Sequence, residues 1–148
     1  MHSPVAAPAA SALSLEVQIA SRYRGVRVLL AEDEPVNREV SVGLLGYAGL
    51  RVDVAVDGQQ AVEMAARNRY ALILMDVQMP RLNGIDATRA IRALPEGARV
   101  PILAMTANVF AEDRDRCIAA GMDDHIGKPV DPDALYAALL KWLAPPAA

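Results

Sequence analysis

Five short apolar runs alternate with amphipathic stretches along the middle of the chain, and this alternation limits the fold more than any other feature. The runs span residues 26–31, 52–56, 71–75, 101–105 and 125–127. Several are apolar throughout rather than at every second residue, as is typical of central parallel strands buried on both faces. Strands separated by helical stretches predict βαβ units. The sequence therefore predicts an α/β fold, a (βα)5 open parallel five-stranded sheet with helices on both faces.

The stretches between the runs carry helix signals. Val36, Val40, Leu44 and Tyr47 lie at positions i, i+4, i+8 and i+11, which is one face of a helix, and Pro35 suits its first turn. The other helical stretches are bounded by turn and cap residues, namely Asp57 and Gly58, Asn83 and Gly84, Gly121, and Asp131 and Pro132. Strands and helices together account for residues 25–143, which we expect to form one domain.

The segments outside this domain are harder to interpret. Residues 1–12 and 144–148 are rich in Ala and Pro, which is typical of linkers or tails. Within residues 13–24, the apolar residues Leu13, Leu15, Val17 and Ile19 alternate with polar ones, which favours a half-buried strand, although a short helix fits as well. We therefore expect residues 1–24 to be a linker or tail and leave the structure of 13–24 unassigned.

The overall charge argues against nucleic acid as a partner. Asp and Glu number 18 against 15 Lys and Arg, so the formal net charge is −3, whereas nucleic-acid binding needs clustered basic residues. No apolar run approaches the ~20 residues needed to cross a bilayer, and the N-terminal residues lack the features of a secretory signal. We expect a cytoplasmic chain without direct membrane contact.

Charged and polar side chains follow four of the five predicted strands. Glu32 and Asp33 come after the first strand, Asp76 ends the third, Thr106 the fourth and Lys128 the fifth. Ligands of open α/β sheets bind beyond the carboxyl ends of the strands. These five side chains are therefore predicted to meet at one edge of the sheet.

Carboxylates gathered in this way need a cation. At ~5 Å and an effective dielectric near 20, two like charges repel by about 3 kcal/mol. Oxygen ligands favour Mg²⁺, which also picks up phosphate oxygens. For Glu32 and Asp33 a simpler role is open, because an acidic residue ahead of Pro35 can cap a helix.

The remaining groups suit phosphoryl chemistry. Asp76 can act as a nucleophile toward phosphorus and form an aspartyl phosphate, while Lys128 can pair with a phosphoryl oxygen and Thr106 can donate to another. A nucleotide fold would instead place a glycine-rich loop after the first strand. The residues there are Ala-Glu-Asp-Glu-Pro, which argues against dinucleotide binding.

Four motifs in order resemble the receiver domain of two-component response regulators. They are Leu-Leu-Ala-Glu32-Asp33-Glu-Pro-Val-Asn37, Leu-Met-Asp76-Val-Gln-Met-Pro with Gly84 following, Met-Thr106-Ala107 and Gly-Lys128-Pro129. The resemblance covers residues 25–143, and the sequences of these motifs are most similar to those in receivers of hybrid sensor histidine kinases. It implies a flavodoxin-like sheet with strand order 2-1-3-4-5.

The resemblance also implies a metal site and a phosphorylation site. Asp76 would be the phosphoacceptor. Asp33 and Asp76 would bind Mg²⁺ or Mn²⁺ directly, together with the backbone carbonyl of Gln78, and Glu32 would act through water. Gln78 and Asn108, which lie two residues beyond Asp76 and Thr106, match positions that tune hydrolysis of the acyl phosphate.

Further residues match positions that respond to the phosphoryl group. Thr106, Ala107 and Lys128 would contact its oxygens, and the Lys128–Pro129 peptide bond is often cis in this family. One position departs from the family pattern: the switch residue three before the lysine is commonly aromatic, and here it is His125. Histidine titrates near neutral pH, so signalling through Thr106 and His125 would be pH-sensitive.

The resemblance implies partners rather than a free-standing catalyst. The phosphodonor would be a histidine kinase or a histidine phosphotransfer protein, docked in part by the first helix with Asn37, Val40 and Leu44. A homodimer would form through the face of the fourth helix, fifth strand and fifth helix. The chain would promote only its own phosphorylation and dephosphorylation, either as a stand-alone receiver or as the cytoplasmic part of a membrane-bound kinase.

Two other readings of the site remain as alternatives. A Mg²⁺-dependent phosphatase of the haloacid dehalogenase type also forms an aspartyl phosphate, but it carries a second Asp two residues after the nucleophile, where this chain has Gln78. A receiver-like module that binds partners without phosphorylation would be signalled by loss of Asp76, Asp33 or Lys128, and all three are present.

Overall fold

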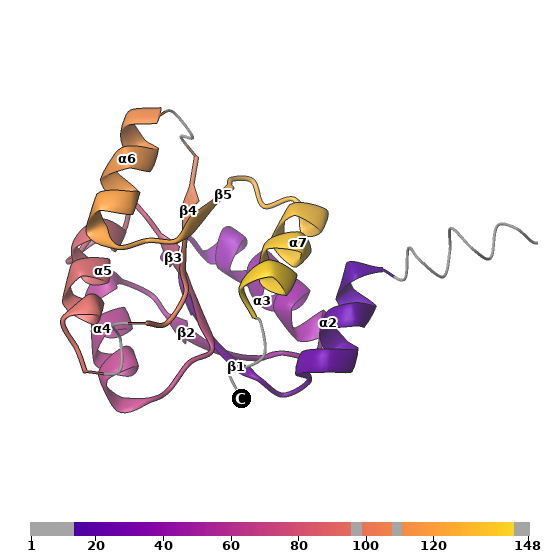
Figure 1. Ribbon diagram of the computed structural model, residues 1–148. Coiled ribbons are helices and arrows are strands. Elements are labelled where there is room, and N and C mark those ends of the chain that lie inside the picture. The colour runs from indigo at the N-terminus through magenta and orange to yellow at the C-terminus, as the bar shows by residue number, and fades with distance from the viewer. Residues whose placement is uncertain (1–13, 96–98, 108–110, 144–148) are drawn as a thin grey trace, which may run out of the picture.

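Five parallel strands form one sheet in the order β2-β1-β3-β4-β5 in the computed structural model of the chain (Figure 1). The structure describes residues 14–95, 99–107 and 111–143. The strands are β1 (Arg27–Ala31), β2 (Arg51–Ala55), β3 (Leu72–Asp76), β4 (Ile102–Thr106) and β5 (Asp124–Gly127). The helices are α2 (Leu15–Tyr23), α3 (Pro35–Tyr47), α4 (Gly58–Arg67), α5 (Gly84–Arg92), α6 (Ala111–Ala120) and α7 (Pro132–Trp142). The predicted (βα)5 sheet and its strand order are confirmed.

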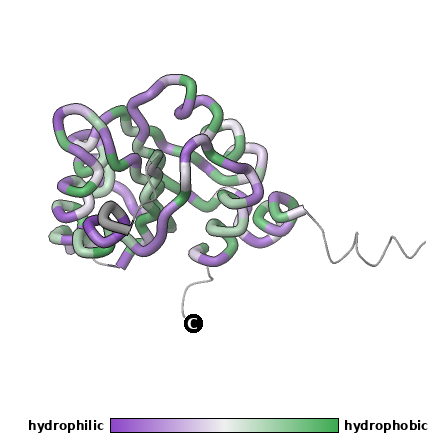
Figure 2. The backbone as a smooth tube through the Cα atoms, turned by 90° about the horizontal axis from the view of Figure 1, so that it is seen from above, coloured by the Kyte–Doolittle hydropathy of each residue, from purple (hydrophilic) through white to green (hydrophobic). Residues whose placement is uncertain are grey.

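Helices cover both faces of the sheet, which makes three layers. Figure 1 shows α4, α5 and α6 on one side of the strands and α2, α3 and α7 on the other. The strands supply side chains to both layers, since Leu29 and Ala31 of β1 lie in one core cluster and Val28 and Leu30 in the other. Viewed from above, many of the outer turns and loops are hydrophilic (Figure 2). The continuously apolar runs are thus explained by burial on two faces.

Side chains at the helix starts fix where each helix begins. Asp57, Asn83 and Asp131 each accept a hydrogen bond from the backbone N–H three residues on, as N-cap residues do. Pro132 occupies the first turn of α7, as Pro35 does in α3. Each of these helices follows a strand in the chain, so the caps also fix where the loops at the carboxyl ends of the strands stop. Among the described residues no helix is both long and apolar enough to cross a bilayer.

The segment left unassigned from the sequence forms helix α2, not a strand. Its N-cap Ser14 accepts a hydrogen bond from the Val17 N–H. Ile19 is fully buried in the core cluster that α3 and α7 share, whereas Val17 is 47% exposed. Gly49, just after α3, has φ +88°, a left-handed conformation that glycine adopts without strain. Residues 15–23 therefore form a helix of the folded unit, which is the second of the two structures that the sequence leaves open for 13–24.

Candidate functional site

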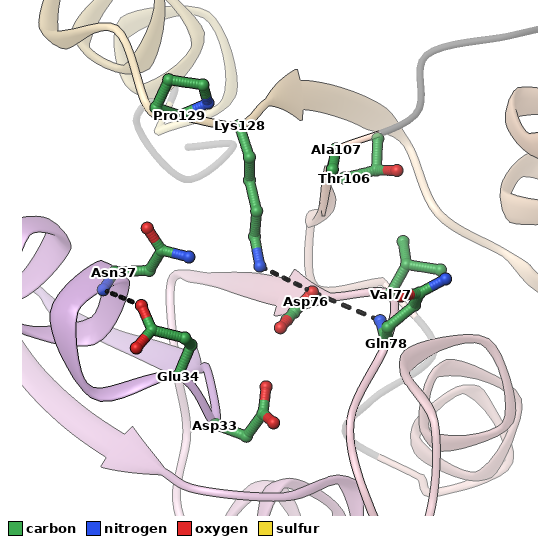
Figure 3. A pocket seen from close by; sticks show the side chains of 10 residues that line it. All are labelled: Asp33, Glu34, Asn37, Asp76, Val77, Gln78, Thr106, Ala107, Lys128 and Pro129. Carbon is green, nitrogen blue, oxygen red and sulfur yellow. Dashed lines mark hydrogen bonds and ion pairs between the residues drawn. The ribbon is translucent and has the colours of Figure 1, made fainter.

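A cleft of about 510 Å³ opens at the carboxyl ends of β1, β3, β4 and β5. The residues that line it come from all four strand ends and from the start of α3 (Figure 3): Asp33, Glu34, Asn37, Asp76, Val77, Gln78, Thr106, Ala107, Lys128 and Pro129. The convergence expected from the sequence is therefore present. Glu32 lies fully buried beneath the cleft rather than on its lining.

Three carboxylates meet at the base of the cleft. Glu32, Asp33 and Asp76 each offer an oxygen atom, and these atoms all lie within 4.8 Å of one another. Glu32 and Asp76 are buried, and Asp33 is partly exposed. Such a set of hard oxygen donors, open to solvent on one side, fits an octahedral Mg²⁺ that retains water ligands. The chemistry of the donor set thus matches the predicted metal.

The helix-capping role falls to a different residue. Glu34 is the N-cap of α3, and its carboxylate accepts hydrogen bonds from the backbone N–H groups of Val36 and Asn37 at 3.1 and 2.9 Å. These two bonds lower the pKa of Glu34. The capping alternative for Glu32 and Asp33 is therefore wrong, and both remain available to a ligand.

Lys128 neutralises part of this negative charge. Its side chain reaches across the cleft (Figure 3), and its Nζ lies 3.1 Å from Oε1 of Glu32 and 3.0 Å from Oδ1 of Asp76. Burial raises the pKa of Asp76 to about 7, and Glu32 adds to the rise while Lys128 opposes it. For Lys128 burial works toward a lower pKa, but its bonds to Asp76 and Glu32 prevail and the pKa is raised. Lys128 therefore stays a cation between two carboxyl groups.

The loop after β3 is shaped around Asp76. The backbone N–H of Gln78 donates to Oδ1 of Asp76 at 3.2 Å, and the N–H of Gly84 donates to the carbonyl of Val77 at 2.9 Å. A Cβ on Gly84 would lie 2.0 Å from the carbonyl oxygen of Asp76, so α5 can begin this close to the strand end only with glycine. The loop therefore aims the carboxylate of Asp76 into the cleft.

The middle of the same loop rests on the start of α4. A Cβ on Gly58 would lie 1.9 Å from the carbonyl oxygen of Leu82, so the two segments pack backbone to backbone. Arg81 has φ 71°, which is the left-handed region, and its Nη1 lies 3.6 Å from Oδ2 of Asp57. The loop that carries Gln78 is thus held from two sides.

Thr106 and Ala107 form the opposite wall of the cleft. Thr106 ends β4, is 8% exposed, and accepts at its carbonyl a hydrogen bond from the backbone N–H of Lys128 at 2.9 Å. This bond extends the pairing of β4 and β5 to the lysine itself. The Lys128–Pro129 peptide bond is cis, as the family resemblance implies. Asn108 lies outside the described residues.

His125 lies elsewhere. It is on β5 but lines a separate hollow of about 200 Å³ against α6 that also includes Cys117 and Asp124. The His125 N–H donates to Oδ1 of Asp124 at 2.9 Å, and Oδ2 of Asp124 accepts a bond from Nε1 of Trp142 at 2.8 Å. The structure thus brings His125 toward α6 and not to the cleft with Asp76. Its switch role stays a prediction.

One contributor to the site carries no motif signal. Nη1 of Arg38, on α3, donates to the backbone carbonyls of Glu32 and Asp33 at 3.2 Å each. Any residue supplies a backbone carbonyl, so nothing in the sequence pairs Arg38 with these two positions. Only the folded geometry reveals the contact.

Comparisons with known proteins agree with this geometry. The family described as the response regulator receiver domain matches residues 28–140. "Two-component system protein A" of Emericella nidulans is 41% identical over 146 residues, which is 94% of this chain and 21% of that protein. The chain spans 7% to 21% of the length of the first three curated relatives that it matches.

Solved structures give the same result. The receiver domain of sensor histidine kinase PA1611 from Pseudomonas aeruginosa PAO1, with a magnesium ion coordinated in its active site cleft, is 46% identical with a TM-score of 0.78, covering 82% of this chain and 99% of that one. The receiver domain of Ssk1, in complex with the histidine phosphotransfer protein Ypd1 of Saccharomyces cerevisiae, is 29% identical with a TM-score of 0.75, covering 80% and 89%.

Proposed function

The chain belongs to the response regulator receiver family and is a phosphorelay signalling domain, and on this premise we propose that Asp76 accepts a phosphoryl group from a phosphohistidine. The observation that carries the assignment is the position of Asp76 at the base of the cleft, 3.0 Å from Nζ of Lys128 and within reach of two further carboxylates. In the proposed reaction an Asp76 oxygen bonds to phosphorus as the nitrogen–phosphorus bond breaks. The nitrogen keeps the electron pair, and an aspartyl phosphate forms.

The acidic cluster is proposed to hold Mg²⁺, with Mn²⁺ as a substitute. Asp33, Asp76 and the backbone carbonyl of Gln78 would supply direct ligands, and the buried Glu32 would act through water. The bound ion would neutralise charge on the phosphoryl oxygens, which is the main requirement of phosphoryl transfer. It would also favour the ionised form of Asp76, which is the form that can attack phosphorus.

Lys128 and Thr106 are proposed to bind the transferred group. Lys128 pairs with Asp76 and Glu32, so a phosphoryl group on Asp76 would offer its ammonium a closer and more highly charged partner. The Thr106 hydroxyl and the space beside Ala107 would accommodate another oxygen, and Gln78 and Asn108 would tune hydrolysis. Movement of Lys128 and Thr106 toward the phosphoryl group would shift the domain between two conformations.

The proposed phosphodonor is a histidine kinase or a histidine phosphotransfer protein, docked along α3. Val36, Val40 and Tyr47 are 66%, 49% and 79% exposed, and they share the outer face of a helix whose first turn borders the cleft. An apolar helix face with no partner suits a protein–protein contact. It begins close enough to Asp76 to place a bound histidine over the carboxylate.

The signal is proposed to leave through the face formed by α6, β5 and α7, where a homodimer would also form. Ile118 on α6 is 63% exposed, as an interface residue of this face would be. We further propose that the full protein is a hybrid histidine kinase, since relatives such as "Sensor histidine kinase RcsC" of Salmonella typhi match this chain over 13% of their length. In that setting the domain would work on the cytoplasmic side of the membrane.

Labelling with acetyl phosphate tests the central assignment. The wild-type chain is expected to gain one phosphoryl group by intact mass in the presence of Mg²⁺ and none after chelation. Asp76→Asn should gain none. Asp86→Asn is the matched control, because Asp86 lies on the half-exposed first turn of α5. Equal labelling of Asp76→Asn and wild type would refute the assignment.

The same preparation separates the alternatives. A phosphatase of the haloacid dehalogenase type would turn over phosphate monoesters, and we expect no turnover. A module that binds partners without phosphorylation would stay unlabelled at any Mg²⁺ concentration.

A further inference from the structure

Arg38 ties helix α3 to the loop that carries two of the acidic side chains. It lies in the first turns of α3 and is partly buried. Its Nη1 donates to the carbonyl oxygen of Glu32 at 3.2 Å and to that of Asp33 at 3.2 Å. One guanidinium nitrogen therefore bridges two successive carbonyl groups of the segment between β1 and α3.

Other bonds of that segment include the cap bonds of Glu34 with α3 and the ion pair of Lys128 with Glu32. The Glu32 N–H donates to the carbonyl of Ala55 at 3.0 Å, which continues the pairing of β1 with β2. The N–H of Glu34 donates to Oε2 of Glu32 at 3.1 Å, so a bond of the loop itself depends on a side chain of the acidic cluster. Beyond Glu32, Arg38 supplies the bond that fixes the backbone of Asp33.

We propose that Arg38 is a positioning residue of the metal site, which sets the directions of the Glu32 and Asp33 side chains by holding the carbonyl groups of the same residues. This inference rests on the proposed Mg²⁺ site. Rotating a peptide group turns the side chains on either side of it, so a free loop would let the carboxylates spread under their mutual repulsion. Both bonds come from Nη1 of Arg38, which lies one bond further from the Cα than the Nζ of a lysine would, so a lysine at this position would fall short of the two carbonyl groups.

The charge of Arg38 affects Mg²⁺ affinity in the opposite direction to its positioning role. Its positive charge lies behind the cluster and repels a bound cation, so charge alone predicts tighter Mg²⁺ binding when Arg38 is removed. Positioning predicts weaker binding. The two explanations are separated by Arg38→Lys, which keeps the charge and loses the paired contact, beside Arg38→Gln, which loses both.

The experiment measures Mg²⁺ binding to the whole chain by isothermal titration calorimetry. Loss of outer contacts to metal ligands weakens metal binding about 10–100-fold, and we expect at least the lower figure for both Arg38→Lys and Arg38→Gln. Arg51→Gln is the matched control, because Arg51 is exposed at the opposite edge of the sheet, at the start of β2. It should bind Mg²⁺ as wild type does.

Acetyl phosphate labelling supplies a second readout. For both Arg38 variants the Mg²⁺ concentration that gives half the maximal rate should rise about tenfold. Unchanged Mg²⁺ affinity in both variants would overturn the inference, as would tighter binding in Arg38→Gln with no change in Arg38→Lys. A wild-type chain that binds no Mg²⁺ would instead overturn the proposed function, and the inference with it.

Discussion

Replacing Ile19 with alanine should lower the free energy of unfolding by about 3 kcal/mol, because the side chain fills a core position and not a surface one. Ile19 is 0% exposed and packs in the cluster formed by α2, α3 and α7. The substitution removes the equivalent of three methylene groups, which at ~0.8 kcal/mol each is worth about 2 kcal/mol of transfer free energy. The cavity left among Leu45, Leu139 and their neighbours adds the rest.

The matched control lies on the same helix. Val17 is also β-branched, but it is 47% exposed, so Val17→Ala should change the stability by no more than about 0.5 kcal/mol. Both substitutions alter helix propensity in the same sense, and the difference between them isolates burial.

Urea unfolding measures the difference directly. The sequence contains one tryptophan, Trp142, which lies on the helix that α2 packs against, so its fluorescence reports this part of the fold. The midpoint should fall for Ile19→Ala with the slope unchanged. If the two variants unfold within about 0.5 kcal/mol of each other, α2 is not part of the core and the reasoning is refuted.

Three further changes test the cleft and its loops. Gly84→Ala should destabilise the domain by at least about 2 kcal/mol because its Cβ would meet the Asp76 carbonyl at 2.0 Å. Gly43→Ala should instead stabilise it by about 0.5–1 kcal/mol, because Gly43 lies in the middle of α3 and a Cβ there meets nothing within 4 Å. Urea unfolding measures both changes, and changes of the same sign would contradict this reasoning. Arg81→Gly should raise the melting temperature, since relief of the left-handed backbone is worth about 1 kcal/mol, more than the 3.6 Å ion pair to Asp57 that it loses, in which the arginine side chain is 71% exposed. A lower melting temperature would speak against strain at this residue. In chelator, the raised pKa of Asp76, about 7 against an ordinary 3.8, means that the folded state holds the proton more tightly. The contribution of Asp76 to the free energy of unfolding is therefore greatest below pH ~4 and falls as the pH rises toward 7, by at most about 1.4 kcal/mol per pH unit. Asp76→Asn should reduce the fall in the free energy of unfolding between pH 5 and 8, measured by urea unfolding at each pH. An unchanged dependence of that free energy on pH would count against the burial argument.

The strands and most of the site could be predicted because the responsible forces act on residue type. Strands such as 72–76 are buried on both faces, which requires apolar side chains at successive positions. The ends of parallel strands must meet at one edge, so Asp76 and Lys128 were predicted to be neighbours from order alone.

Two points that the sequence leaves open are decided by equally local causes. Leu15, Val17 and Ile19 are two residues apart, which a strand would place on one face, but Leu15 and Ile19 also fit one face of a helix, and packing against α7 decides between them. The assignment of the cap to Glu34 rather than to Glu32 or Asp33 depends on where the strand ends, and a shift of one residue exchanges the roles.

Helix α2 extends the folded unit beyond the residues that the family match covers. It begins at Leu15, well before residue 28, where the family match starts, and burial of Ile19 against α3 and α7 fixes its axis. The folded unit therefore reaches back to Ser14, and residues 15–23 cannot turn independently of the sheet. Turning α2 relative to the sheet requires Ile19 to leave the core cluster, at an energetic cost comparable with a sizeable part of the stability of an ordinary domain.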